Sequence, residues 1–218
     1  MTTPSAPAHP LTFTDARLRP PLPRRSGRAR SHVVLEPLTP LADSGAAPVG
    51  YLARPPREFA GAGEELAWIR WTVTALGVLA PGAFLAASIN GETLVSAQAQ
   101  ETLGGFGRHL MPILEPARVG RRLEELGKAR VTARNLGMPC AIGGQRVRSA
   151  AGFDALVVEP ARAAATIAMG GCPLLIATRL DTQADLDWAR RQGANLIGGR
   201  AIAEPLRVAP VDVSRLQR

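Results

Sequence analysis

The chain is short of several residue types on which common sites depend. Lys128 is its only lysine, so chemistry that needs a lysine beside a reacting phosphate has a single candidate. Two cysteines, Cys140 and Cys172, stand in apolar runs without the spacing of a zinc site or a disulfide framework. The three histidines are far apart and form no ligand pair. We therefore expect reduced core thiols, no metal site, no cofactor and a cytoplasmic location.

Aromatic residues are also scarce, at 4% of a chain that is 46% hydrophobic. This composition predicts one domain of 218 residues with a core of small aliphatic side chains. Residues 71–89 carry no charge, but Ala80-Pro81-Gly82 interrupts them. We interpret this stretch as a buried helix, a turn and a buried strand rather than a membrane span. Trp68 and Trp71 lie three apart on the predicted helix, a spacing that predicts packing.

Positive charge is unevenly distributed along the chain. The formal net charge is +8, of which residues 1–30 contribute +5 through six arginines and one aspartate. Proline is frequent in the same segment, so we expect a disordered basic arm over 1–30, a folded domain over 31–210 and a tail over 211–218. The folded part keeps only +3, so we expect no stable nucleic-acid binding. Weak attraction of the arm to an anionic membrane or nucleic acid is the alternative.

Short apolar runs recur along the folded part and predict eight buried strands. They cover residues 32–36, 48–53, 84–89, 110–114, 138–142, 154–158, 173–177 and 194–197. Patterns with a period of 3.6 predict helices at 64–79, 117–136, 160–170 and 182–192. Alternation of helices with nearly continuous apolar strands predicts parallel pairing. The predicted fold is α/β, a shortened TIM-like (β/α)8 barrel, and an open doubly wound sheet is the alternative.

In such a barrel the chemistry lies at the carboxyl ends of the strands, and these ends carry a family resemblance. Residues 174–205 read LLIATRLDTQADLDWARRQGANLIGGRAIAEP. They resemble the closing segment of EAL domains, the cyclic di-GMP phosphodiesterase barrels of bacterial signalling. That segment has a strand ending in Ala-Glu-Gly-Val-Glu-Thr, a helix, and a strand ending in Gln-Gly. Further matches to the family's strand ends occur upstream in the same order, so the resemblance spans residues 31–206. They lie at 49–54 (the position of Glu-Ala-Leu-x-Arg), 89–91, 113–115, 141–144 and 154–159.

The resemblance implies two divalent cations held by carboxylates and one asparagine, with a lysine near the attacking water. Most of the matching positions carry residues without that chemistry, namely Gly50, Gly143, Gly144, Val157, Thr178 and Gly198. Asn90 and Glu115 remain, and Asp181 is a shortened stand-in for a later glutamate. Lys128 lies in a predicted helix, away from the strand ends. We therefore expect phosphodiesterase activity to be lost.

Two functions fit this pattern. The first is a catalytically inactive signalling scaffold or protein-interaction module, with unidentified protein partners or a second copy of the chain. The second is a metal-independent receptor for cyclic di-GMP, with guanidinium groups on the phosphates. The candidate nucleotide- or phosphate-binding residues are Arg54, Asn90, Glu115, Arg179, Asp181 and Arg200.

Each candidate also has an ordinary structural explanation. A salt bridge would account for Arg54, a turn cap for Asn90, and an N-cap for Asp181. Glu115 precedes a predicted helix start, where a carboxylate is favourable. A third function class is an unrelated phosphate-binding barrel enzyme, because Gly198-Gly199-Arg200 is similar to the terminal phosphate loop of such barrels. Those enzymes usually need a lysine or paired acids at strand ends.

Overall fold

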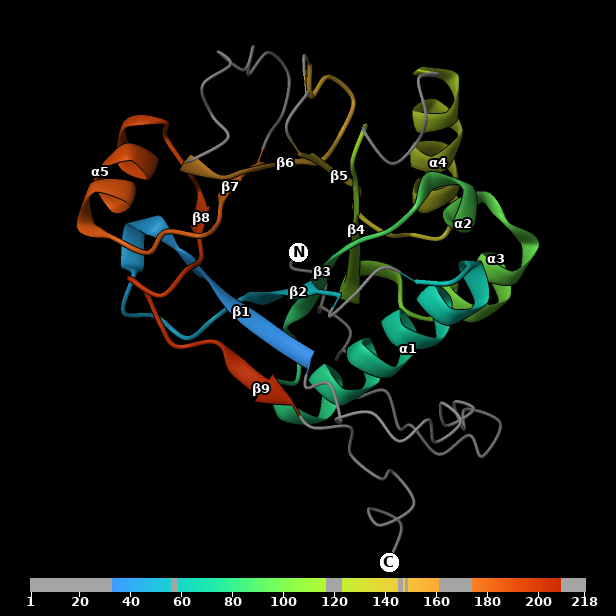
Figure 1. Ribbon diagram of the computed structural model, residues 1–218, viewed down its shortest axis with the longest axis horizontal. Coiled ribbons are helices and arrows are strands. Elements are labelled where there is room, and N and C mark those ends of the chain that lie inside the picture. The colour runs from blue at the N-terminus through green and yellow to red at the C-terminus, as the bar shows by residue number, and fades with distance from the viewer. Residues whose placement is uncertain are drawn as a thin grey trace, which may run out of the picture.

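The structure is a computed structural model that describes residues 33–55, 59–116, 123–144, 147, 149–160 and 174–208. The expected arm (1–30), all but the first residue of the expected helix (160–170), and the tail (211–218) lie outside these ranges. Within them, eight strands form a closed ring with helices around it (Figure 1). The strands are β1 (Val33–Pro40), β2 (Gly50–Arg54), β3 (Phe84–Ser88), β4 (Leu110–Leu114), β5 (Ala141–Gly143), β6 (Ala155–Val158), β7 (Leu174–Ala177) and β8 (Leu196–Ile197).

Strand β1 closes the ring. It pairs with β2 on one side, where Leu35 lies opposite Ala53, and with β8 on the other, where Thr39 lies opposite Ile197. The closed ring confirms the TIM-like α/β barrel and excludes the open sheet. Neighbours from β2 to β8 are parallel, as expected, but both pairings of β1 are antiparallel. The parallel prediction is wrong for β1 because the connection at 41–49 is too short for a crossover.

A ninth strand, β9 (Leu206–Val208), was not expected from the sequence. It pairs antiparallel with the start of β1, with Leu35 opposite Leu206. Three residues after a proline give too short a pattern to reveal a strand. This pairing places the last described residues of the chain beside the start of β1.

The barrel interior and the helical layer form separate apolar cores. The interior is filled mainly by Leu38, Leu52, Ala86, Met111, Ile113, Ala141, Ala155, Ile176 and Leu196. The helices and 3-10 turns outside it are η2 (Leu41–Asp43), α1 (Ala62–Leu79), α2 (Gly91–Val95), α3 (Ala97–Leu103), η3 (Gly107–His109), α4 (Leu123–Asn135) and α5 (Gln183–Arg191). Most residues of β1 to β8 are therefore buried whether they face inward or outward, as expected for barrel strands.

Helix α1 and strand β3 confirm the interpretation of the uncharged stretch 71–89. The helix ends at Leu79, a turn follows, and β3 begins at Phe84. Trp68 and Trp71 are partly buried and pack against the core, as predicted. Cys140 is also buried, and this burial raises the pKa of its thiol to about 12, so the thiol is protonated at neutral pH.

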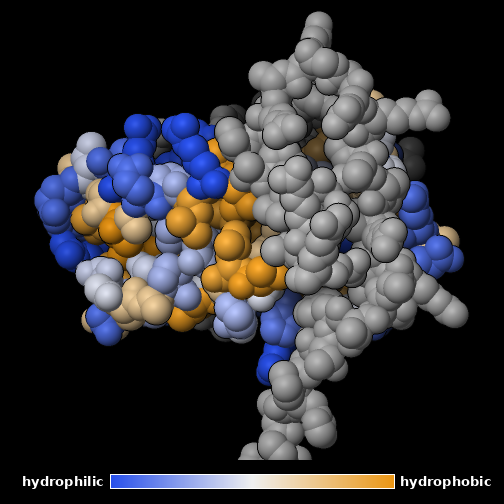
Figure 2. Space-filling view, turned by 90° about the horizontal axis from the view of Figure 1, so that it is seen from below, coloured by the Kyte–Doolittle hydropathy of each residue, from blue (hydrophilic) through white to orange (hydrophobic). Residues whose placement is uncertain are grey.

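The surface of the described residues is mixed. Figure 2 shows apolar areas beside strongly hydrophilic ones on the face seen from below. Val78 and Leu79, the last residues of α1, are 64% and 55% exposed. None of the described helices is long and apolar enough to cross a membrane.

Candidate functional site

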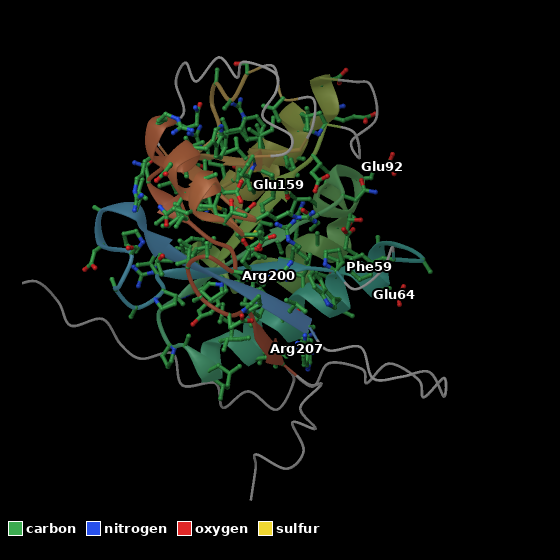
Figure 3. All side chains as sticks on the ribbon, turned by 60° about the vertical axis from the view of Figure 1, so that its left-hand side comes forward. Phe59, Glu64, Glu92, Glu159, Arg200 and Arg207 are labelled. Atoms are coloured by element: carbon green, nitrogen blue, oxygen red, sulfur yellow. The ribbon has the colours of Figure 1, made fainter. Side chains whose placement is uncertain are left out.

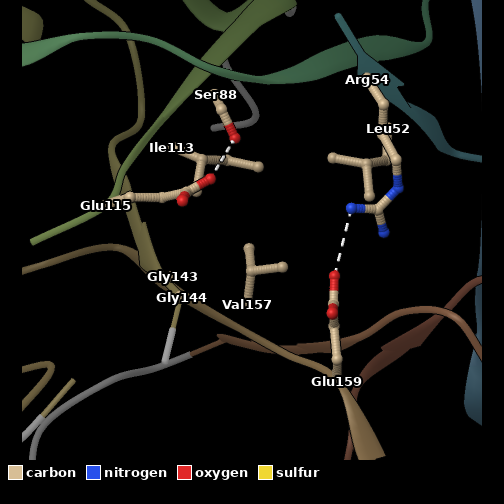
Figure 4. A pocket seen from close by; sticks show the side chains of 9 residues that line it. All are labelled: Leu52, Arg54, Ser88, Ile113, Glu115, Gly143, Gly144, Val157 and Glu159. Atoms are coloured by element: carbon tan, nitrogen blue, oxygen red, sulfur yellow. Dashed lines mark hydrogen bonds and ion pairs between the residues drawn. The ribbon is translucent and has the colours of Figure 1, made fainter. Parts of the chain in front are cut away.

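The carboxyl ends of the parallel strands surround one mouth of the barrel. A cavity of about 50 Å³ lies there (Figure 4), lined by Leu52, Arg54, Ser88, Ile113, Glu115, Gly143, Gly144, Val157 and Glu159. On this measure one water needs about 10–15 Å³, so the cavity has room for a few waters. We call this region the mouth.

Arg54, at the end of β2, is held across the mouth by residues from three other strands. Its Nη1 donates to Glu159 Oε1 at 3.1 Å, and its Nη2 contacts Glu36 Oε2 at 3.5 Å and Thr178 Oγ1 at 3.4 Å. The Glu36 and Glu159 side chains are only 10% and 11% exposed, whereas that of Arg54 is 33% exposed. These contacts agree with the salt-bridge explanation of Arg54. A role of Arg54 in binding a nucleotide remains a prediction.

Arg179 engages the same two carboxylates from the loop after β7. Its backbone N–H donates to Glu36 Oε1 at 3.0 Å, and its Nε lies 3.2 Å from Glu159 Oε1. Arg179 has φ of +57°, a conformation that is uncommon outside glycine. The hydrogen bond to Glu36 stabilises this turn, which leaves the Arg179 side chain half exposed at the mouth.

Glu115 follows β4 and lines the opposite side of the cavity. Its Oε1 accepts a hydrogen bond from Ser88 Oγ, at the end of β3, at 2.8 Å. Gly144, with φ of +100°, lies beside it, and a Cβ there would stand 3.6–3.7 Å from the Glu115 side chain. The structure thus places Glu115 in the mouth with Arg54, as the sequence predicts.

Asn90 lies beyond β3 and caps a helix. Its Oδ1 accepts from the Glu92 N–H at 3.3 Å, so Asn90 is the N-cap of α2. Its own backbone N–H donates to the buried Glu65 Oε1 at 3.0 Å. Asn90 is not among the residues that line the cavity. The capping explanation is confirmed, and a ligand role for Asn90 stays a prediction.

Asp181 and Arg200 form an exposed pair at the rim, separate from the Arg54 cluster (Figure 3 labels Glu159 and Arg200). Asp181 Oδ1 lies 3.3 Å from Arg200 Nε, and the two side chains are 45% and 69% exposed. The expectation that Asp181 caps α5 is wrong, because the N-cap is Thr182. Thr182 and Asp185 form a reciprocal capping box, and the hydrogen bond from Thr182 lowers the pKa of Asp185.

Gly50 does not face the mouth, although the sequence comparison placed it on the family's signature glutamate. It begins β2, and a Cβ there would come within 2.5 Å of the Phe84 ring. The residue of β2 that lines the cavity beside Arg54 is Leu52. Neither glycine nor leucine has a side chain that could bind a metal ion.

The donor set does not fit the two-cation site that the resemblance implies. Around the cavity, Leu52, Gly143, Gly144 and Val157 supply no oxygen ligand from their side chains. Among the residues that the structure describes, no three His, Cys, Asp or Glu side chains gather in a way that could hold a metal ion. The remaining carboxylates of the mouth are engaged by arginines or by Ser88.

Two of the three backbone N–H groups in the Gly198-Gly199-Arg200 turn already have acceptors. The N–H of Gly198 donates to Ala177 O at 2.9 Å, and the N–H of Arg200 lies 3.4 Å from Asp181 Oδ1. Gly199 packs against the backbone of Leu180 with φ of +140°. A Cβ on Gly198 would stand 2.8 Å from Pro37 O, so close backbone approach explains these glycines better than anion binding.

Among the residues that the structure describes, five charged side chains at the mouth are close to balanced. Three carboxylates (Glu36, Glu115 and Glu159) face two guanidinium groups (Arg54 and Arg179), a formal sum of −1. An anionic dinucleotide would therefore meet no excess of positive charge from these five residues.

Glu36 and Glu159 are the site residues that the sequence reasoning missed. Glu159 directly follows the apolar run 154–158, so it stands at a strand end, where site residues are expected. Glu36 ends the apolar run 32–36, and an acid inside a predicted strand is a signal of a buried partner. Their pairing with Arg54 becomes visible only when the barrel closes.

No protein-family model matches the sequence, and no curated protein matches it. Solved structures do match. An EAL domain protein from Listeria monocytogenes superposes with a TM-score of 0.59 and 10% identity, covering 85% of this chain and 91% of that one. The EAL domain of Mycobacterium smegmatis DcpA gives 0.60 and 15%, covering 84% and 96%. The EAL domain of Xanthomonas citri FimX, in complex with c-diGMP, gives 0.56 and 11%, covering 80% and 87%.

These comparisons establish the fold. Each aligns most of both chains, and at identities of 10–15% they speak for architecture alone. The chain has the fold of EAL domains, which confirms the resemblance found in the order of its strand ends.

Proposed function

We propose that this chain is a catalytically inactive EAL-like domain that serves cyclic di-GMP-related signalling through contacts with other proteins. The observation that carries the proposal is the Arg54 cluster, in which guanidinium groups neutralise two of the mouth's carboxylates. Metal-assisted attack on a phosphodiester needs carboxylates that are available to cations. The lining residues Leu52 and Val157 add no polar side chain that could replace them.

A receptor for cyclic di-GMP is the second candidate. It is favoured by the position of Arg54 at the mouth and by the similar fold of the FimX EAL domain, whose structure contains c-diGMP. Against it stand the small cavity and the engagement of Arg54 by Glu36, Glu159 and Thr178. Binding would require these contacts to break, so we rank the receptor below the interaction module.

Calorimetric titration of the full chain with cyclic di-GMP, with and without Mg²⁺, separates these candidates. The proposal predicts no heat of binding under either condition and no linear dinucleotide in the recovered sample. Binding that is lost in Arg54→Ala and kept in Arg200→Ala would establish the receptor. Arg200 is a matched control because it is also an ion-paired arginine but lies at the exposed rim.

A further inference from the structure

Helix α1 presents an uncharged face on the outside of the barrel. We define the α1 face as the residues of its C-terminal half that lie opposite its buried side, together with its last residue: Trp71, Thr74, Ala75, Val78 and Leu79. An exterior helix usually carries charged or polar side chains on this side. Helix α5 follows that rule, since Arg190 and Arg191 lie exposed on it. The α1 face therefore has the character of a surface that is covered.

The side chains of the α1 face are only partly buried. Val78 and Leu79 are more than half exposed, whereas Trp71 and Ala75 pack against the core with one side. Thr74 Oγ1 donates to the carbonyl oxygen of Arg70 at 2.9 Å, so its hydroxyl is bonded within the helix. The face therefore suits an apolar cover that brings no charge onto it.

The first and last described residues both lie beside this helix. Val33 pairs with Val208, and both belong to the same apolar cluster as Val73 of α1. Figures 1 and 3 both show β9 beside α1. Eight extended residues span up to about 27 Å, which is also about the length of a helix of 18 residues. The segment 209–216 is therefore long enough to reach the α1 face from the end of β9.

The composition of the two flanking segments favours the C-terminal one as the cover. The tail carries Val211, Val213 and Leu216 within eight residues of Val208. On the other side, residues 23–32 read PRRSGRARSH, and the nearest large apolar residue, Leu22, is eleven positions before Val33. The tail therefore brings apolar side chains to α1 over a much shorter length of chain.

A second copy of the chain fits the α1 face less well. The nine residues from Trp71 to Leu79 form a strip about 14 Å long and about 10 Å wide. Specific interfaces between proteins bury about 800 Å² on each partner. A strip of this size suits a segment that is already tethered beside it, because tethering replaces an association in solution by an intramolecular one.

We propose that Val211, Val213 and Leu216 of the tail pack on the α1 face of the same chain and shield it from solvent. None of the α1 face residues lines the cavity at the mouth. The inference therefore concerns a second surface and does not rest on the proposed function. It removes the α1 face from the surfaces that are open to other proteins.

The test is a double-mutant cycle on the full chain, with Tm as the measured quantity. The α1 variant is Val78→Thr with Leu79→Gln, and the tail variant is Val211→Thr with Val213→Thr and Leu216→Gln. All five changes introduce a polar group of similar size without changing the net charge. We expect the tail variant to lower Tm by about 3 °C when α1 is unchanged, because apolar area returns to water. In the α1 variant the same tail changes should lower Tm by less than about 1 °C, because the contact is already weakened.

The arm provides the matched control, as Leu18→Gln with Leu22→Gln. This arm variant should lower Tm by less than about 1 °C whether or not α1 is changed. A tail effect of equal size in both backgrounds would overturn the inference, and so would coupling of the arm, rather than the tail, to α1. Light scattering tests the second copy, since a dimeric wild type that becomes monomeric in the α1 variant would also overturn the inference.

Hydrogen exchange gives a second measurement that does not depend on the α1 variant being folded. In the tail variant, the backbone amides in the last two turns of α1 should exchange at least about threefold faster than in the wild type, because the cover is lost. The amides of α5 should keep their rates. Unchanged exchange in α1, or an equal increase in α5, would contradict the inference.

Discussion

Glu159 gives the clearest stability prediction, because one of its oxygens serves two arginines. Its Oε1 lies 3.1 Å from Arg54 Nη1 and 3.2 Å from Arg179 Nε. Glu159→Gln keeps the shape and a hydrogen-bond acceptor, but it removes the negative charge. The perturbation therefore isolates the ionic part of the cluster.

The size of the stability loss depends on how exposed the two ion pairs of Glu159 are. Because the Arg54 side chain is one-third exposed, loss of its ion pair with Glu159 should lower the free energy of unfolding by about 1 kcal/mol after solvent screening. The Arg179 contact is half exposed and should lose about 0.5 kcal/mol. A total of about 1.5 kcal/mol lowers Tm by about 3–6 °C for a domain of this size.

Urea unfolding monitored by circular dichroism measures this change. Glu101→Gln is the matched control, because Glu101 is exposed on α3 and should change stability by less than about 0.5 kcal/mol. The two variants should differ less in their loss of unfolding free energy in high salt, because salt screens the ion pairs. If Glu159→Gln is no more destabilising than Glu101→Gln, the cluster contributes nothing to stability and the reasoning fails.

Three further predictions concern other parts of the fold. Gly199→Ala should lower Tm by more than about 6 °C, because φ is +140° and the Leu180 backbone leaves no room. Gly193→Ala shares a positive φ, of +70°, but no atom crowds its Cβ, so it should lower Tm less in the same scan. Burial raises the pKa of the Cys140 thiol to about 12, so this thiol should resist alkylation in the native state. The free energy of unfolding should fall as pH rises above about 9, because only the unfolded thiol ionises there. Alkylation of Cys140 as fast in the native protein as in urea would contradict this prediction. Thr182→Ala should lower Tm by about 2–4 °C by removing the N-cap of α5. Because the pKa of Asp185 is lowered, its part of the capping box should be present above about pH 4 and lost as pH falls further, so acid titration should show a smaller loss in the variant.

The strands were predictable because barrel strands are buried on both faces and therefore read as continuous apolar runs. The run at 110–114 coincides with β4, and 154–158 contains β6. Short elements gave no such signal. Helix α2 has five residues and depends on the Asn90 cap, and β9 has three and depends on β1.

The composition of the mouth was only partly predictable. Arg54 and Glu115 were identified because they follow strand ends, and both line the cavity. Their partners were not, because the residues that hold Arg54 lie 18, 105 and 124 positions away and come together only through barrel closure. A salt bridge was one explanation of Arg54 from the sequence, but sequence position alone did not identify its partners.

The most direct test of the account is a turnover assay with the full chain. Cyclic di-GMP is incubated with the protein and Mn²⁺ or Mg²⁺, and the nucleotides are separated by chromatography beside an active EAL domain. With the mouth's Glu36 and Glu159 neutralised by Arg54, we expect the cyclic dinucleotide to be recovered intact under conditions in which the active domain consumes it. Metal-dependent appearance of the linear dinucleotide would contradict the account.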